Sequence, residues 1–226
     1  MALALLVVMV ISMVMKQLSA SSCAPSHPQE KFCRADFVLR GRVLEEELTY
    51  FPETDMVSEK TYTVSVSKKG HIFKGELTCG NVTIITSGSD ITSGVTMETE
   101  KEYVISGIAL PDGTLLTTSC EFVMPYSMVN SHQRRGLRFK YNQGCPCKMR
   151  RCYGDDCTMM SDWSIDGDTC LWRHTNVFNP NDCYSKYTYC LNNTLGVCGW
   201  KSNRMFEDCV LDDSTRLTMT GEEIRV

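Results

Sequence analysis

The sequence predicts a mostly β protein, a small barrel or sandwich with flanking helices, cross-linked by disulfides. Two observations support this fold class. Short stretches rich in β-branched and aromatic residues follow one another between residues 37 and 118, and turn residues such as Pro111-Asp112-Gly113 separate them. The chain also holds 13 cysteines in 226 residues, a density typical of the disulfide framework of a secreted protein.

The N-terminal end indicates a secretory leader. Residues 3–14 are almost wholly apolar, but the run is too short to span a bilayer comfortably. We therefore interpret residues 1–20 as a cleaved signal peptide and expect a secreted, extracellular protein without a membrane anchor. Cleavage after Ala20 would leave Ser21 as the first mature residue, whereas cleavage two residues later would leave Cys23.

The stretch SSCAPSHPQEKFC, residues 21–33, would then begin the mature chain. Pro25 and Pro28 fix φ and disfavour helix in the residues before them, and the cysteines at both ends can tether the segment to the body of the protein. These features favour a stiff, extended ridge with an exposed N-terminus. Such a ridge loses little entropy on entering a cleft, but the same features also suit a pinned arm that binds nothing.

The β pattern is carried by five stretches, at residues 37–44, 62–67, 82–86, 103–108 and 115–118. Residues 123–141 instead look helical near their middle. We expect Ser127 to cap this helix and Gln133 to lie on its exposed face with Arg134 and Arg135. These two arginines, with Arg138 and Lys140, form a basic group that suits a solvated helix face and could also meet an anionic matrix polymer.

Several function classes find no support in the sequence. A formal net charge of −4 and the lack of a basic stripe with interleaved aromatics argue against nucleic acid as a partner. The sequence contains no His-Glu-x-x-His, no Gly-x-Ser-x-Gly and no phosphate-cradling loop, so we expect no enzyme. Asn81 and Asn192 begin glycosylation sequons, which indicates a glycoprotein. Structural zinc could be bound by the group Cys145, Cys147, Cys152 and Cys157. Disulfides are favoured instead, because a secreted protein folds in an oxidising compartment.

The motifs of the mature chain resemble those of the tissue inhibitors of metalloproteinases. Cys23-Ala-Pro-Ser-His-Pro-Gln followed by Phe-Cys33 is similar to the N-terminus of that family, and further similar stretches follow in order along nearly the whole mature chain. They are Phe-Lys-Gly at 73–75, Lys-Glu-Tyr-Val-Ile-Ser-Gly at 101–107, Ser-Cys-Glu-Phe-Val-Met-Pro-Tyr at 119–126, Gln-Arg-Arg-Gly at 133–136, Gly-Cys-Pro-Cys-Lys-Met-Arg-Arg-Cys-Tyr-Gly-Asp-Asp-Cys at 144–157, Cys-Leu-Trp at 170–172 and Val-Cys-Gly-Trp at 197–200. The chain resembles an invertebrate-like or divergent member, because Ser21 stands where the family has its first mature cysteine.

The resemblance implies a two-part architecture. It implies an OB-like (netrin-like) five-stranded barrel domain over residues 21–145 and a small disulfide-rich domain over residues 146–226. The disulfides implied by the family are Cys23–Cys120, Cys33–Cys145, Cys147–Cys198, Cys152–Cys157 and Cys170–Cys190. Cys183–Cys209 is the favoured extra bridge, which leaves Cys79 as the odd thiol, although cysteine spacing alone permits many other connectivities.

The resemblance also implies a function, inhibition of zinc metalloendopeptidases of the matrix metalloproteinase type. In the family, the amine and carbonyl of the first mature residue chelate the catalytic zinc of the protease, so this role would pass to Ser21. That zinc belongs to the partner, and we expect the chain to need no cofactor of its own. The protease-binding residues implied here are Ser21, Ser22, Cys23, Ala24, Pro25, Arg34, Asp90, Ile91, Thr92 and Ser93.

One departure from the family affects the expected potency. The partner of the family's first cysteine aligns with Ser93, so both halves of that disulfide are serine here. The loss removes the disulfide that would hold the first residue in place, and it leaves no unpaired cysteine at either position. The alternative function is therefore a non-inhibitory extracellular matrix or binding protein built on the same module.

Overall fold

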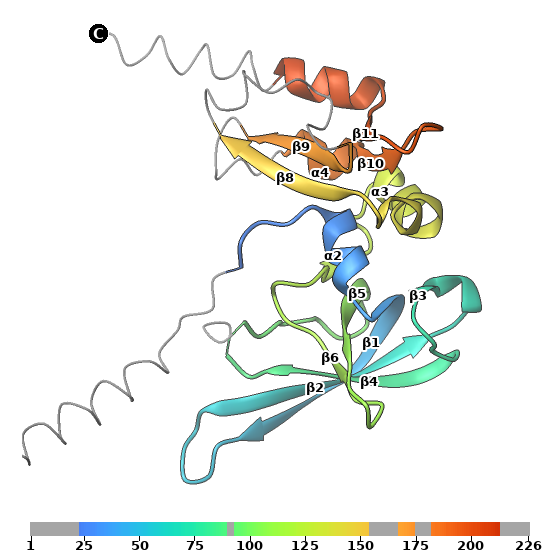
Figure 1. Cartoon of the computed structure of the whole chain (residues 1–226). Coiled ribbons are helices and arrows are strands. Elements are labelled where there is room, and N and C mark those ends of the chain that lie inside the picture. Colours follow the sequence, from blue (N-terminus) through green and yellow to red (C-terminus); the bar gives the residue numbers. More distant parts are fainter. Residues whose placement is uncertain (1–22, 90–92, 154–166, 175–181, 213–226) are drawn as a thin grey trace, which may run out of the picture.

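A computed structural model of the chain describes residues 23–89, 93–153, 167–174 and 182–212 (Figure 1). Its strands are β1 (Phe37–Tyr50), β2 (Val57–Val66), β3 (Ile72–Lys74), β4 (Gly80–Ser87), β5 (Glu102–Ala109), β6 (Leu115–Leu116), β7 (Met124–Pro125), β8 (Lys148–Tyr153), β9 (Thr169–His174), β10 (Tyr189–Asn192) and β11 (Cys198–Lys201). Its helical elements are α2 (Pro28–Arg34), η1 (Lys69–His71), α3 (Ser131–Arg135), the π-helical turn η3 (Gly136–Lys140), η4 (Asn142–Gly144) and α4 (Cys183–Tyr187). Residues 204–212 are also helical.

Five strands close into a barrel, which confirms the predicted fold class. The order β1-β2-β4-β6-β5 returns to β1, because β1 pairs antiparallel with both β2 and β5. β4 and β6 are parallel, and β3 and β7 lie at the two ends of the seven-stranded order. The long β1 can serve several neighbours because it bends, with a register shift between Val43 and Glu45. At Gly41, just before this shift, a Cβ atom would collide with the side chain of Val64, so the close approach of β1 and β2 requires glycine.

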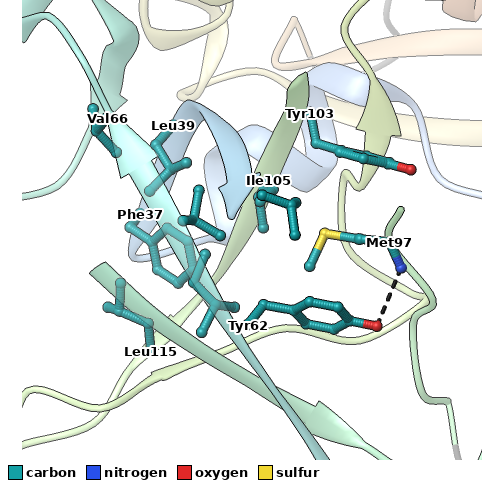
Figure 2. Packing of buried hydrophobic residues seen from close by; sticks show 11 residues of the cluster. Phe37, Leu39, Tyr62, Val66, Met97, Tyr103, Ile105 and Leu115 are labelled. Carbon is teal, nitrogen blue, oxygen red and sulfur yellow. Dashed lines mark hydrogen bonds between the residues drawn. The ribbon is translucent and has the colours of Figure 1, made fainter. Parts of the chain in front are cut away.

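The interior of the barrel is an apolar cluster (Figure 2). Phe37 and Leu39 of β1 point into it and pack with Tyr62, Ile105 and other buried residues of the facing strands. The hydroxyl of Tyr62 donates to Glu46 Oε1 over 2.6 Å and accepts from the backbone N–H of Met97 over 3.2 Å. The buried phenol therefore has partners on both sides, which avoids the cost of an unsatisfied polar group.

A second apolar cluster lies outside the barrel and holds the helices. Val38 and Val104 alternate with the inward-facing residues of β1 and β5, so they contribute to this outer cluster. Phe32 of α2, Leu137 and Tyr141 of the α3–η4 region, and Tyr189 of β10 complete it, together with Ala35, Phe122, Tyr126 and Val129. Both faces are covered only at Phe37–Leu39 of β1 and at Tyr103–Gly107 of β5, so these stretches are buried without alternation, whereas the end of β1 is exposed.

The helix after the barrel differs from the sequence expectation. The prediction of Ser127 as its cap is wrong: α3 begins at Ser131, and the Asn130 side chain accepts from the N–H of Gln133 over 2.8 Å. Gln133 Oε1 in turn accepts a hydrogen bond from the Asn130 N–H over 3.1 Å, which completes a capping box. Gln133 is also buried rather than exposed, because its amide donates to the carbonyl of Ser185 in the C-terminal part.

The C-terminal part consists of two small sheets and short helices packed beside α2 and α3 (Figure 1). β8 and β9 form a parallel pair, and β10 and β11 an antiparallel pair. Tyr189 donates to the carbonyl of His132 over 2.7 Å, and Asn130 donates to the carbonyl of Lys186 over 3.0 Å. Polar bonds as well as apolar packing therefore join this part to the barrel. In the described part of the chain, no helix is both long and apolar enough to cross a membrane.

Candidate functional site

The segment that leads into α2 is extended up to His27 and helical from Pro28. This corrects the expectation of a fully extended ridge through residue 33: Pro28 occupies the first helical position, where its missing N–H costs nothing. His27 is the N-cap, and its Nδ1 accepts from the N–H of Gln29 over 3.1 Å. Its Nε2 therefore carries the proton and donates to the carbonyl of Tyr184 over 3.0 Å. Residues 23–27 thus emerge from a capped, well-anchored helix start.

His27 is wholly buried and neutral. Its ring centroid lies 5.6 Å from that of Trp172 and 5.3 Å from that of Trp200, and both tryptophans belong to the C-terminal part. Burial lowers the pKa of His27 to about 4, and the bond to the Tyr184 carbonyl offsets this only in part. These contacts give His27 a packing role between α2 and the C-terminal part.

Gln29 fastens α2 to β10. Its Nε2 donates to the carbonyl of Cys190 over 2.7 Å, and its Oε1 accepts from the N–H of the same residue over 3.0 Å. Gly144 lies against this pair so closely that a Cβ atom would overlap both the Gln29 amide and the Cys190 carbonyl. The side-chain amide thus replaces a strand partner for β10 and fixes the rotation of α2.

Disulfides hold the segment at both ends. Cys23 is bonded to Cys120 and Cys33 to Cys145, with Cα separations of 5.1 and 5.3 Å. At the C-terminal end of α2, Lys74 Nζ donates to the carbonyls of Phe32 over 3.2 Å and Cys33 over 2.8 Å. This lysine satisfies two helix carbonyls that would otherwise lack partners.

The start of the segment lies beside the loop after β4. Cys23 Sγ is 3.7 Å from Ser119 Oγ, and the N–H of Ser119 donates to the carbonyl of Ser93 over 2.9 Å. Ser119 therefore links Cys23 and Ser93, which come from the two stretches of protease-binding residues that the resemblance implies. These three residues are called the edge below. Ser93 is buried with φ of 66°, and Gly94 after it packs against the backbone of Ser87 and Ser89 too closely for any Cβ atom.

The predicted site residues are thus brought together only in part. Ala24 and Pro25 are exposed next to the anchored Cys23, and the backbone of Ser93 reaches the same place through Ser119. Arg34 is exposed at the opposite end of α2. The remaining predicted contacts lie outside the described residues, namely Ser21, Ser22, Asp90, Ile91 and Thr92.

Sequence reasoning missed three residues that position this edge. Gln29, Lys74 and Ser119 bind the backbone groups described above, and each stands inside a motif that was noted for its resemblance alone. The available signal was a polar residue next to a proline, glycine or cysteine inside a family-like motif. Its bonding partner is distant in the sequence, so no local pattern points to it.

Three more bridges lie within the described residues: two of the pairs that the resemblance implies and the favoured extra bridge. Cys147 is bonded to Cys198, Cys170 to Cys190, and Cys183 to Cys209. Cys79 is a free, exposed thiol. Cys152 is disulfide-bonded, and its predicted partner Cys157 lies outside the described residues.

Two further predictions concern surface chemistry. Asn81 and Asn192 are both exposed, as a glycan acceptor must be, and their glycosylation stays a prediction. Within the described residues, no group of three or more histidine, cysteine, aspartate or glutamate side chains could hold a metal ion.

The fold and this edge define a class of protein: a disulfide-tied β-barrel that presents an anchored, exposed N-terminal segment beside one barrel loop. Comparison with known proteins identifies the family. The family model described as Tissue inhibitor of metalloproteinase matches residues 19–200. The chain belongs to this family.

Its curated relatives are similar along most of their length. The chain is 30% identical to Metalloproteinase inhibitor 2 of Homo sapiens over 196 residues, which cover 85% of this chain and 86% of the relative. It is 31% identical to Metalloproteinase inhibitor 2 of Cavia porcellus over 185 residues, which cover 80% and 81%. It is 28% identical to Metalloproteinase inhibitor 4 of Rattus norvegicus over 185 residues, which cover 80% of each chain.

Proposed function

We propose that this chain is a secreted, non-enzymatic inhibitor of zinc metalloendopeptidases of the matrix metalloproteinase type. The relatives named above are metalloproteinase inhibitors, and the chain shares their family over most of its length. The observation that carries the proposal is the juxtaposition of Cys23, Ser119 and Ser93, which holds an exposed segment against a barrel loop.

The mechanism we propose is a wedge. With Ser21 as the first mature residue, its amine and carbonyl oxygen would chelate the zinc of the protease and displace the water that the enzyme activates. Ser22 would enter the pocket beside the zinc, and Ala24 and Pro25 would line the cleft. A free α-amine has a pKa of about 7.7–8.0, so its neutral, ligating form is accessible near neutral pH.

The anchoring of the segment supports such a wedge physically. Three features order the chain just after the proposed ligand: the disulfide to Cys120, the helix cap at His27, and the two hydrogen bonds between the Gln29 side chain and the Cys190 backbone. A segment ordered before binding loses less conformational entropy in the complex, which raises affinity. We infer that residues 21–145 carry this activity and that residues 146–226 form a second domain.

The decisive test is the α-amine of Ser21. Adding one Ala before Ser21, or acetylating the amine, removes the donor geometry without touching the barrel. Either change should reduce inhibition of a matrix-type metalloprotease by orders of magnitude, while circular dichroism is unchanged. One Ala added after Val226 is the matched control and should inhibit like the natural chain.

Two outcomes would contradict the proposed function. If the N-terminally extended protein inhibits as well as the natural one, the wedge mechanism is wrong. If mass spectrometry finds Cys23 as the first residue and the protein inhibits no metalloprotease, a non-inhibitory extracellular matrix or binding protein becomes the better assignment.

A second prediction concerns the vacated disulfide site. If Ser21 and Ser93 occupy that site, their Cα atoms lie within about 7 Å and Ser21→Cys with Ser93→Cys forms a bridge. Holding the first residue in this way should tighten inhibition roughly ten- to hundred-fold, which corresponds to about 1.4–3 kcal/mol of ordering cost removed. Peptide mapping checks the bridge, and two free thiols in the folded double variant would contradict the alignment.

A further inference from the structure

A basic pocket of about 570 Å³ lies on the barrel between β3 and the π-helical turn η3. Its lining includes Arg40, Lys68, His71, Phe73, Arg138 and Phe139. In Figure 1, β3 lies on the right of the barrel and the chain entering α2 lies on the left. The pocket is therefore a separate surface from the edge around Cys23, and its function does not depend on the proposed inhibition.

Positive charge converges on this pocket. Arg40, Lys68 and Arg138 come from three distant parts of the sequence, and all three act on His71. Burial first, and then these cations, lower the pKa of His71, whereas Glu102 opposes them. Glu102 is already paired with Arg40, Nη2 to Oε2 at 2.5 Å, so the hollow keeps a net positive field.

Arg40 is oriented before any ligand arrives. Its guanidinium carbon lies 3.6 Å from the ring centroid of Tyr126, and its Nη2 is held by Glu102. Its Nε is buried and has no hydrogen-bond partner among the residues that the structure describes. A stacked, paired arginine loses little side-chain entropy when it contacts an anion.

Two phenyl rings accompany the cations. Phe73 lines the pocket from β3, and Phe139 is 61% exposed beside Arg138. A binding site for a sulfated polymer would have cations spread along a surface, and aromatic rings would add little to its affinity. Cations around a hollow with adjacent rings favour a compact oxyanion carried on an aromatic body.

We propose that the basic pocket binds an acidic peptide of a partner protein through an oxyanion on an aromatic side chain, as in sulfated or phosphorylated tyrosine. Arg138 and Lys68, both exposed at the pocket, supply charge-assisted hydrogen bonds to the oxyanion. Phe139 packs against the tyrosine ring. Sulfate and phosphate share this chemistry, so binding measurements must separate the two sources.

The experiment measures binding of short fluorescent peptides to the full mature chain. The probes are one acidic peptide with sulfotyrosine, the same peptide with phosphotyrosine, the unmodified peptide and a heparin oligosaccharide. We expect saturable binding of a modified peptide and at least ten-fold weaker binding of the unmodified one. Arg138→Gln and Phe139→Ala should each weaken the modified peptide about ten-fold, because both side chains are exposed and their loss leaves the fold intact.

Arg135→Gln is the matched control, since it removes one exposed arginine from the same region that does not line the pocket. It should bind the modified peptide like the natural chain. Equal affinity for modified and unmodified peptides would overturn the proposal, as would equal losses in the Arg135 and Arg138 variants. Binding of heparin alone, with neither modified peptide bound, would also overturn it and would indicate a polymer surface. Protease inhibition should be unchanged in all three variants, whichever way the peptide result falls.

Discussion

At the scale of single residues, His27 and Gln29 explain why the His-Pro-Gln motif is structural. Both side chains are fully buried, and both bond to the backbone of the C-terminal part, at Tyr184 and Cys190. Each polar atom is thereby satisfied, which a buried side chain requires. The motif orders the exposed segment before it.

His27 makes the stability of the protein depend on pH. Its pKa is about 4 in the folded chain, against about 6.5 when unfolded, so between these values the unfolded chain binds more protons. Stability from His27 is therefore complete above about pH 6.5 and is lost as the pH falls toward 4. His27 alone should contribute about 3 kcal/mol to the fall in the free energy of unfolding between pH 7 and pH 4, measured by urea denaturation as the difference between the natural chain and a variant that does not titrate at this position.

The control for this prediction is His27→Asn, which keeps a capping acceptor for the Gln29 N–H but does not titrate. His132 titrates in the same window, since burial and Arg135 lower its pKa to about 4. The variant should therefore keep a shallower pH dependence than the natural chain. Identical slopes in the two proteins would show that His27 does not contribute.

At the scale of elements, α2 is too short to be stable by itself. It has only seven residues, fewer than an isolated helix needs in water, so tertiary contacts hold it. Those contacts are a His27 cap, the Lys74 bonds to its last carbonyls, and Phe32 in the outer apolar cluster. The disulfide from Cys33 to Cys145 adds a covalent link at the same end.

Removing that link tests how much it contributes. Cys33→Ser with Cys145→Ser should lower the free energy of unfolding by about 2–5 kcal/mol, because the bridge restricts the unfolded chain over a long loop. Denaturant unfolding gives the magnitude, and peptide mapping of the natural protein gives the pairing. Free or differently paired Cys33 and Cys145 in the natural protein would contradict the structure described above.

At the scale of the whole molecule, the barrel and the C-terminal part share one packed boundary. Tyr189 lies in the same apolar cluster as Phe32 and Tyr141, and His27 packs against tryptophans of the C-terminal part. No disulfide of the described residues crosses the proposed domain boundary near residue 145. Packed side chains from the two sides of that boundary nevertheless contact one another.

A chain of residues 21–145 tests this boundary, since it keeps both bridges of the N-terminal segment. It should fold but unfold about 2–4 kcal/mol more easily than the full mature chain, because buried aromatic contacts are lost. It should still inhibit the protease if the proposed wedge is correct. An unchanged free energy of unfolding, measured against the full chain under the same conditions, would show that the shared boundary contributes nothing.

The sequence by itself determined the features that depend on local pattern. The positions of the five barrel strands follow from β-branched and aromatic runs broken by turn residues. The motifs indicated the family, and the resemblance to that family, not the cysteine spacing, implied the bridges. The sequence did not predict the length of β1, because the run through Tyr50 is polar and is a strand only through its pairing with β2.

The tertiary structure alone decided which polar side chains are buried and what they bind. Glutamine is a residue type typical of exposed helix positions, yet Gln133 is buried because it bonds to the carbonyl of Ser185. Asn130, and not the expected Ser127, caps the helix. Gln29 and Cys190 meet in the same way, as do Arg40, Lys68 and Arg138 around the basic pocket. Periodicity and turn chemistry act over a few residues, whereas burial and charge convergence depend on contacts between residues far apart in the chain.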